Sequence, residues 1–176
     1  MRKRKMTKTK ITKEIEQALI QHYCSGQFKN CYGALEVPVG KWLGKGKENI
    51  DMACYKPSNQ EIICCEIKVT KSDFNSPASL SFYGNKNYLA MPLDLAQEID
   101  YDWKHVPKER EKWTHIMQMR QSSCGIIGYD PKQKTLTIVR NSKRREVHLA
   151  SKMQLIEGIM RAGCRDAYKW YTKKDI

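Results

Sequence analysis

The sequence predicts an α/β (α+β) fold in which helices pack against one sheet, and three observations support this prediction. The chain has 176 residues, which is enough for one domain with its own core but short for two. Segments with the periodicity of helices and segments with that of strands are interleaved along it. One strand-like segment, EIICCEIKVT at residues 61–70, is apolar on both faces, which is typical of a central strand covered on both sides.

The N-terminal half is expected to contain a helix followed by three strands. Apolar residues recur at steps of three and four between Ile11 and Leu19, which predicts an amphipathic helix that ends near Ser25. Pro38 favours an edge position or an irregular end for the first strand. The segment KPSN at residues 56–59 predicts a turn between the second and third strands. The strands are predicted at residues 34–39, 49–55 and 61–70.

The C-terminal half is expected to contain a mixed connection, a strand, a helix, a hairpin and a last helix. Ser72 is a candidate cap for a short helical turn after the third strand. The polar stretch 100–121 predicts a loop followed by a helix, and Asp130-Pro131 predicts the turn of the hairpin. The remaining elements are a strand at 87–91, a helix at 92–99, hairpin strands at 125–129 and 136–140, and a helix at 149–160.

Net charge is the strongest bulk property of the chain. It carries 32 Lys and Arg against 19 Asp and Glu, a formal charge of +13 at pH 7. A surplus of this size favours a polyanionic partner, with nucleic acid the first expectation and an anionic membrane surface the second. Residues 1–10 hold six basic side chains and are expected to form a flexible basic arm before a single domain at 11–176; a solvated tail is the alternative.

The composition also limits the class and the location of the protein. No apolar run approaches the roughly 18–20 residues that a membrane helix needs, so a spanning protein is not expected. The charged N-terminus has no apolar stretch behind it, which argues against a secretory signal. Seven cysteines, an odd number, then favour a reducing, cytoplasmic location. Cys64 and Cys65 are adjacent in a strand and are expected to be small core residues on opposite faces.

Three ionisable residues lie in the predicted second and third strands, where burial makes charge unfavourable. Glu66 and Lys68 are two residues apart, so they share one face of their strand. If the two strands form a hairpin, Asp51 lies at the same depth as Glu66, and two such carboxylates repel each other unless a cation lies between them. Oxygen ligands of this kind suit Mg²⁺ or Mn²⁺. The alternative is a buried ion pair that holds the strands in register.

The run IDMACYKPSNQEIICCEIK, which places Asp51, Glu66 and Lys68 on strands after a helix, resembles the PD-(D/E)xK nuclease superfamily. More narrowly, EIKVTKSDF followed by FYGNKNYLAMP is similar to bacterial and phage nuclease-like proteins related to the MmcB DNA-repair family. The resemblance covers residues 33–92. It implies a restriction-endonuclease-like core, with a central mixed sheet flanked by helices.

The same resemblance implies roles for individual residues. Asp51 and Glu66 match the metal ligands, and Lys68 matches the catalytic lysine. Glu36, on the first strand, matches an acid that such proteins often place before the Asp, and it is assigned to the metal as well. The helical acid of the superfamily is either Glu16, Glu36 or absent, and the sequence leaves this open.

These observations predict a Mg²⁺- or Mn²⁺-dependent deoxyribonuclease, a hydrolase of phosphodiester bonds in DNA repair, recombination or phage DNA processing. One alternative is a non-catalytic nucleic-acid-binding protein on the same fold, and another is a basic peripheral protein whose arm binds acidic lipid or a protein partner. The leading prediction has DNA as partner and no membrane, and a homodimer is compatible with it. The candidate DNA contacts are Lys71, Ser72, Lys86, Lys143, Arg144 and Arg145.

Overall fold

The computed structural model describes residues 8–25, 30–39, 48–76, 80, 82–105 and 115–173 of the chain. The strands are β1 (Tyr32–Val39), β2 (Glu48–Lys56), β3 (Glu61–Ile67), β4 (Lys86–Pro92), β5 (Gly125–Asp130) and β6 (Thr135–Arg140). The helices are α1 (Lys10–Cys24), α2 (Lys71–Phe74), α3 (Leu93–His105), α4 (His115–Gln121) and α5 (Leu149–Thr172), with a 3-10 turn at Pro57–Asn59.

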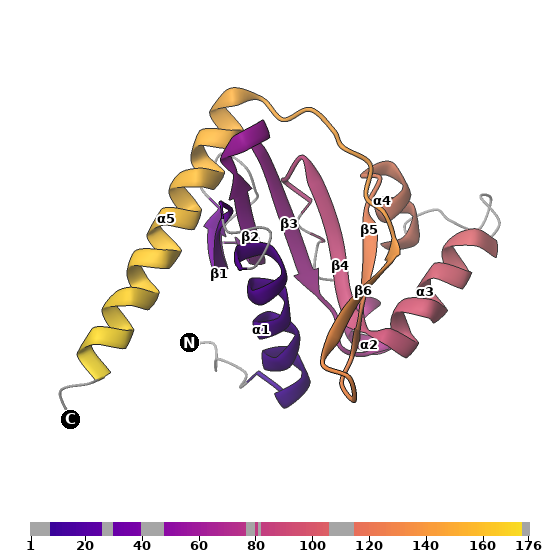
Figure 1. The fold of residues 1–176 in the computed structure, drawn as a ribbon. Helices are drawn as coiled ribbons and strands as arrows, with labels where there is room; N and C mark the ends of the chain where they lie inside the picture. Colours follow the sequence, from indigo (N-terminus) through magenta and orange to yellow (C-terminus); the bar gives the residue numbers. More distant parts are fainter. Residues whose placement is uncertain are drawn as a thin grey trace, which may run out of the picture.

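The strands form one mixed sheet in the order β1-β2-β3-β4-β5-β6, so each strand lies beside its neighbours in sequence (Figure 1). The pairs β3–β4 and β4–β5 are parallel, whereas β1–β2, β2–β3 and β5–β6 are antiparallel. The first parallel connection runs through α2, and the second runs through α3 and α4. This architecture confirms the predicted α/β (α+β) class with a central mixed sheet.

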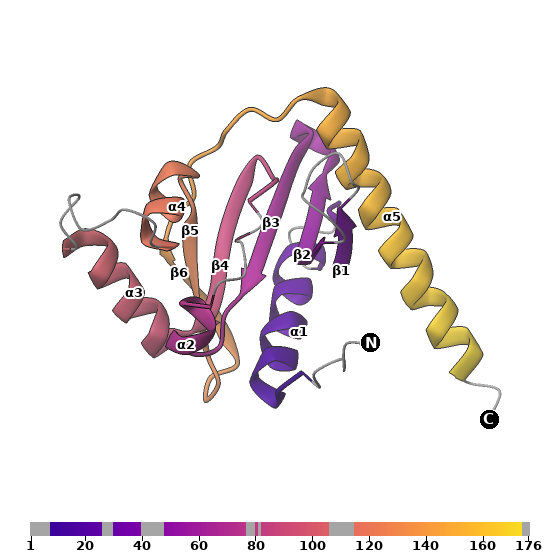
Figure 2. The same cartoon turned by 180° about the vertical axis from the view of Figure 1, so that it is seen from behind.

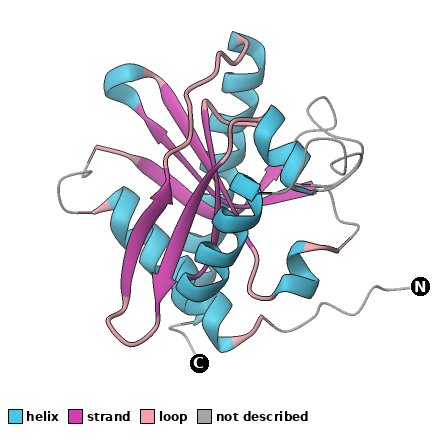
Figure 3. Ribbon diagram, turned by 90° about the vertical axis from the view of Figure 1, so that its right-hand side faces the viewer, coloured by secondary structure: helices cyan, strands magenta, loops and turns pink. Residues whose placement is uncertain are grey.

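Helices cover both faces of the sheet (Figures 2 and 3). On one face, α1 buries Ile15 and Leu19 against β2, β3 and β4. On the other face, α5 packs over β1, β2 and β3, while α2, α3 and α4 pack over β4 and β5. Cys64 belongs to the α5 side and Cys65 to the α1 side, which confirms that both are core residues on opposite faces.

Most predicted elements are present, and the differences lie at their ends. α1 begins at Lys10 because the Thr9 side chain accepts the N–H of Thr12 at 3.3 Å and caps the helix. Lys10 is therefore helical and does not belong to the expected arm, and residues 1–7 lie outside the described residues. β3 ends at Ile67, earlier than predicted, whereas α3 and α5 continue well beyond their predicted ends.

The cap of α2 corrects one prediction. The Thr70 side chain, and not that of Ser72, accepts a backbone N–H, from Asp73 at 3.0 Å. Ser72 lies inside the helix. None of the described helices combines the length and the apolar character that crossing a membrane requires.

Candidate functional site

Three carboxylates lie in a row across the first three strands, and we call Glu36, Asp51 and Glu66 the acidic row. The β2–β3 register pairs Met52 with Cys65, which places the preceding Asp51 opposite Glu66. The β1–β2 register pairs Leu35 with Met52 and Val37 with Ile50, which places Glu36 opposite Asp51. The hairpin predicted from the sequence therefore brings Asp51 and Glu66 to the same depth.

Asp51 is the centre of this row. Its Oδ2 accepts the backbone N–H of Ile67 at 2.7 Å. This side-chain bond takes the place of a backbone hydrogen bond between β2 and β3. Ile67 is the last residue of β3. The Asp51 and Glu66 carboxyl groups are hydrogen-bonded to each other. Burial raises the pKa of Asp51 above its ordinary value, although the Ile67 N–H, the Glu66 bond and the charges of Lys8 and Lys68 oppose this shift. Two carboxyl groups in contact require a shared proton or a cation.

Lys68 is held beside the row by the start of α2. Its side chain is buried, and its Nζ lies 3.8 Å from Oδ1 of Asp73. The other oxygen of Asp73 accepts the N–H of Val69 at 3.0 Å, and the Thr70 cap holds the N–H of Asp73. Lys68 directly follows the last residue of β3, and its charge acts on the Asp51 carboxyl group. Asp73 thus positions Lys68, a role that the sequence did not reveal.

Lys8 occupies the space between two other acids. Its ammonium group is hydrogen-bonded to the buried Glu16 of α1 and lies 2.9 Å from Oε1 of Glu36. Burial alone would lower the pKa of Lys8, but the bonds to Glu16 and Glu36 outweigh it and raise the pKa. Glu16 and Glu36, the two alternatives for the helical acid, therefore both contact Lys8. Lys8, in the segment 1–10 that was expected to form a flexible arm, is ion-paired with both acids.

The backbone at Glu36 is unusual and is held from α5. Glu36 has a φ of 47°, in the left-handed region that residues other than glycine seldom adopt. Arg165 donates to the carbonyl oxygens of Leu35 at 2.8 Å and of Glu36 at 3.0 Å. The start of α1, the end of β3 and the C-terminal half of α5 all lie toward the lower end of the view in Figure 1. Arg165 was not predicted, because the predicted helix ended before it.

The acids fit a hard divalent cation in their chemistry, since all of them offer carboxylate oxygens. In the described part of the chain, no group of three or more His, Cys, Asp or Glu side chains is arranged to hold a metal ion. The acids instead make two separate sets of contacts. Asp51 contacts Glu66, and Lys8 contacts Glu16 and Glu36. The pair formed by Asp51 and Glu66 is therefore the part of the row best suited to a cation.

Of the expected DNA contacts, Lys71 and Ser72 lie nearest the acidic row, on α2. The Lys71 side chain is half exposed and is paired with Glu98 and, at 3.9 Å, with Asp102 of α3. The acidic partners of Lys71 lower the positive potential that it would offer to a phosphate. No described contact ties Ser72 to the acidic row.

The other expected DNA contacts lie elsewhere. Lys86 pairs with Ile63 in the register, toward the start of β3, and its Nζ is 3.5 Å from Glu61. Arg144 lies 3.7 Å from the same Glu61 and is also paired with Glu146. Arg145 has a structural role, because its guanidinium donates to the carbonyls of Gly84, at 2.9 Å, and of Phe82, and its N–H donates to Asn85. Lys143 lines a separate pocket.

Comparisons with known proteins bear on the fold. No protein family model matches the sequence, and no curated protein matches it. Among solved structures, the chain is similar to the SPO1766 protein of unknown function from Silicibacter pomeroyi, with a TM-score of 0.64 and 13% sequence identity. The match covers 96% of this chain and 96% of that chain. The two proteins therefore share a fold along almost their whole length.

Proposed function

We propose that this protein is a Mg²⁺- or Mn²⁺-dependent nuclease with a restriction-endonuclease-like core that hydrolyses phosphodiester bonds in DNA. The contact between Asp51 and Glu66, with Lys68 directly after the end of β3, carries the proposal. A buried carboxyl pair is unfavourable without a proton or a cation, so it is seldom kept for structure alone. The net charge of +13 supports a polyanionic substrate.

In this proposal each residue of the site has a separate task. Asp51 and Glu66 hold the divalent ion, which supplies Lewis acidity and neutralises charge at the scissile phosphate when bound. Lys68 orients the attacking water and balances negative charge on the phosphate. Asp73 keeps the Lys68 ammonium group in place. Lys8 offsets one of the two negative charges of Glu16 and Glu36, which limits the repulsion between these acids and the DNA backbone.

One observation favours a second function, non-catalytic binding of nucleic acid on the same fold. The ammonium group of Lys8 already lies between Glu16 and Glu36, where it offsets one of their two negative charges without any metal. A protein that only binds DNA gains from such neutralisation, because fewer carboxylates then repel the phosphates. Cleavage assays separate the two functions.

The test compares cleavage by the wild type with that by Asp51→Asn, Glu66→Gln and Lys68→Met, on single-stranded, duplex, flapped and branched DNA. Glu61→Gln is the matched control, because Glu61 is a buried glutamate of the same strand at its other end. Mg²⁺ and Mn²⁺ should support cleavage, whereas Ca²⁺ should allow binding with little turnover. Each site variant should lose on the order of 10²-fold or more in rate, while Glu61→Gln stays active.

Two results would overturn the nuclease proposal. One is cleavage that continues unchanged in excess EDTA, and the other is a folded Glu66→Gln variant with full activity. Tight DNA binding without cleavage, for every ion and substrate, would instead establish the non-catalytic function. Circular dichroism of each variant shows whether the fold is retained.

A further inference from the structure

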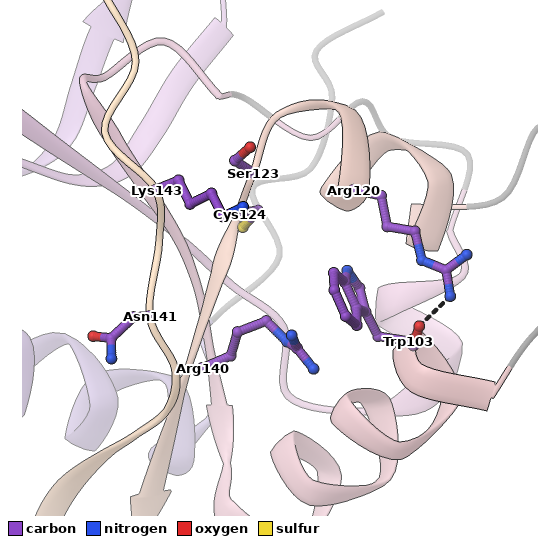
Figure 4. A pocket seen from close by; sticks show the side chains of 7 residues that line it. All are labelled: Trp103, Arg120, Ser123, Cys124, Arg140, Asn141 and Lys143. Carbon is purple, nitrogen blue, oxygen red and sulfur yellow. Dashed lines mark hydrogen bonds between the residues drawn. The ribbon is translucent and has the colours of Figure 1, made fainter.

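A second site lies between α3, α4 and β6, apart from the acidic row (Figure 4). It is a pocket of about 130 Å³. Its lining includes Trp103, Arg120, Ser123, Arg140, Asn141 and Lys143. These residues come from the end of α3, from α4 and the turn after it, and from the end of β6 and the segment that follows.

Trp103 brings two guanidinium groups to the pocket. The Arg140 guanidinium lies 3.5 Å from the centroid of the Trp103 ring, and that of Arg120 lies 5.2 Å from it. Arg120 also donates to the backbone carbonyl of Trp103, as the dashed line in Figure 4 shows. Asp100, one turn earlier on α3, lies 2.5 Å from Arg140 and 2.8 Å from Lys104. The arginines are thus held in fixed positions before any ligand arrives.

Two donors at this pocket have no acceptor among the described residues. They are Nε1 of Trp103 and Nε of Arg140, and both atoms are buried; Nη2 of Arg140 makes no hydrogen bond either, but it lies 2.5 Å from Oδ1 of Asp100. Native proteins satisfy nearly all buried donors, so two unsatisfied donors on adjacent side chains require an explanation. An acceptor-rich ligand that shifts these side chains as it enters the pocket would satisfy both.

The charged side chains around the pocket determine the sign of the charge that a ligand should carry. The cations that line the pocket are Arg120, Arg140 and Lys143, and Asp100 is ion-paired with Arg140, which together leave a formal charge of +2. Burial would raise the pKa of Asp100, but the bonds from Lys104 and Arg140 outweigh it and lower the pKa, so the group stays ionised near neutral pH. The pocket therefore favours an anion with more than one negative charge.

We propose that this pocket binds a phosphoryl group, either the terminal phosphate monoester of a nucleic-acid strand or free inorganic phosphate. Guanidinium groups match phosphate oxygens in geometry, and a phosphate monoester is close to a dianion at neutral pH. The pocket suits a small group such as a phosphoryl group, since pockets that enclose drug-sized molecules measure about 300–1,000 Å³. The proposal does not depend on whether the acidic row cleaves DNA.

The test measures binding in EDTA, so that any cleavage is suppressed. Isothermal titration with inorganic phosphate should show saturable binding to one site on the wild type. Fluorescence anisotropy then compares oligonucleotides of one sequence that carry a phosphate or a hydroxyl at the 5′ or the 3′ end. We expect a phosphorylated end to bind at least fivefold more tightly than the same end with a hydroxyl.

Three variants assign these effects to the pocket. Trp103→Phe keeps an aromatic ring but removes the Nε1 donor and one of the two fused rings on which Arg140 stacks, and Lys143→Gln removes an exposed charge, so neither should unfold the protein. Each should weaken phosphate binding about tenfold. Lys132→Gln, an exposed lysine on the β5–β6 turn, is the control for net charge and should bind phosphate as the wild type does.

The outcomes separate the two sources of phosphate. A preference for a phosphorylated end that Trp103→Phe removes assigns the pocket to strand ends. Saturable binding of phosphate without that preference assigns it to the free ion. Absence of both effects overturns the proposal, as does an equal loss in Lys132→Gln. Asp51→Asn should bind phosphate like the wild type, so a failure of the nuclease proposal leaves this result unaffected.

Discussion

The carboxyl group of the buried Glu66 shares a hydrogen bond with that of Asp51, which is partly buried. Burial makes a second negative charge unfavourable there, and this is why the pKa of Asp51 is raised. Without a metal, Asp51 therefore holds its proton to a higher pH than an isolated carboxyl group does. The proximity of the two carboxyl groups, which favours binding of a cation, therefore lowers the stability of the metal-free protein at neutral pH.

Replacing Asp51 by Asn tests whether the carboxyl pair lowers the stability of the metal-free protein. A carboxyl group whose pKa is higher in the folded than in the unfolded protein binds more protons when folded. Stability is therefore lost as the pH rises from the unfolded value, near 3.8, through the folded one. Asp51→Asn removes this pH-dependent loss of stability, because asparagine does not titrate, and it keeps an oxygen acceptor for the Ile67 N–H. We expect the variant to be more stable than the wild type at pH 7 by about 1 kcal/mol and to lose this advantage toward pH 4.

Urea denaturation in EDTA between pH 4 and pH 8 measures the difference. Asp94→Asn, at an exposed position of α3, is the control and should follow the wild-type pH profile. A variant at Asp51 with the wild-type profile would show that the pair carries no excess proton. Added Mg²⁺ should then stabilise the wild type more than Asp51→Asn, because only the wild type has both carboxylates.

Lys8 competes with any cation that approaches the acidic row. Its ammonium group is bound to Glu16 and Glu36, so a divalent ion must either displace it or bind beside it. Lys8→Met keeps much of the side-chain volume and removes the charge. We expect Mn²⁺ to bind this variant about tenfold more tightly, because one repelling charge among the acids is gone. In EDTA the variant should be less stable than the wild type.

Electron paramagnetic resonance of free Mn²⁺ gives the affinities directly. Lys10→Met is the matched control, because Lys10 is exposed and faces Glu14 at 3.8 Å on α1. If Lys8→Met binds Mn²⁺ no better than Lys10→Met does, then Lys8 does not compete for the site, and the acids near it are not metal ligands.

The sequence identifies some residues of the site and misses others for a physical reason. Asp51, Glu66 and Lys68 are visible because ionisable residues interrupt apolar strands. Lys8 and Arg165 give no such signal, because their partners lie far away in the chain and only the tertiary fold brings them together.

The lengths of the elements depend on contacts that periodicity does not reveal. β3 ends at Ile67 because Asp51 takes its N–H group, although the apolar pattern continues. α5 continues past its predicted end at residue 160 and through Gly163, because one glycine costs a helix only about 1 kcal/mol. The existence of the periodic elements was predictable, and their ends were not.

The two central glycines of α5 give a matched pair of variants. A Cβ atom at Gly158 would lie 2.6 Å from the carbonyl oxygen of Pro38, whereas one at Gly163 would meet nothing within 4 Å. Gly158→Ala should therefore force α5 away from β1 and destabilise the protein by about 1–3 kcal/mol. Gly163→Ala should stabilise it by about 0.5–1 kcal/mol, because alanine favours the helix.

Thermal and urea denaturation of both variants measure these changes. Because α5 also supplies Arg165 to the strand that bears Glu36, Gly158→Ala should weaken metal binding as well as stability. Equal effects of the two substitutions would contradict the observed packing of α5 on β1.

The two proposed sites are related through the sheet. Glu66 pairs with Leu89, Leu89 with Ile126, and Ile126 with Arg140. The acidic row and the phosphoryl pocket therefore lie at one level of the sheet, three strands apart, or roughly 14 Å at the usual strand spacing. The apolar cluster under α3 lies between them. A strand of nucleic acid that contacts both sites must therefore pass around α3.

The net charge of +13 acts on folding and on DNA binding in opposite directions. Salt screens the repulsion among the basic side chains, so the melting temperature should rise between 50 and about 300 mM NaCl. Salt also removes the gain from counterion release, so DNA affinity should fall over the same range. Opposite changes in the two quantities would show that charge, and not partial unfolding, controls binding.

The basic arm can be tested within this salt series. Replacement of Arg2, Lys3, Arg4 and Lys5 by Gln removes four charges and leaves Lys8 in its ion pairs. Each lost phosphate contact lowers the slope of log affinity against log salt by about 0.9 on duplex DNA, so the slope should fall by at most about 3.6. Affinity should weaken for all sequences alike, and cleavage at saturating DNA should persist, because the acidic row lies in the sheet. An unchanged slope would show that the arm does not contact DNA, and the search for phosphate contacts would then turn to Lys143 and its pocket.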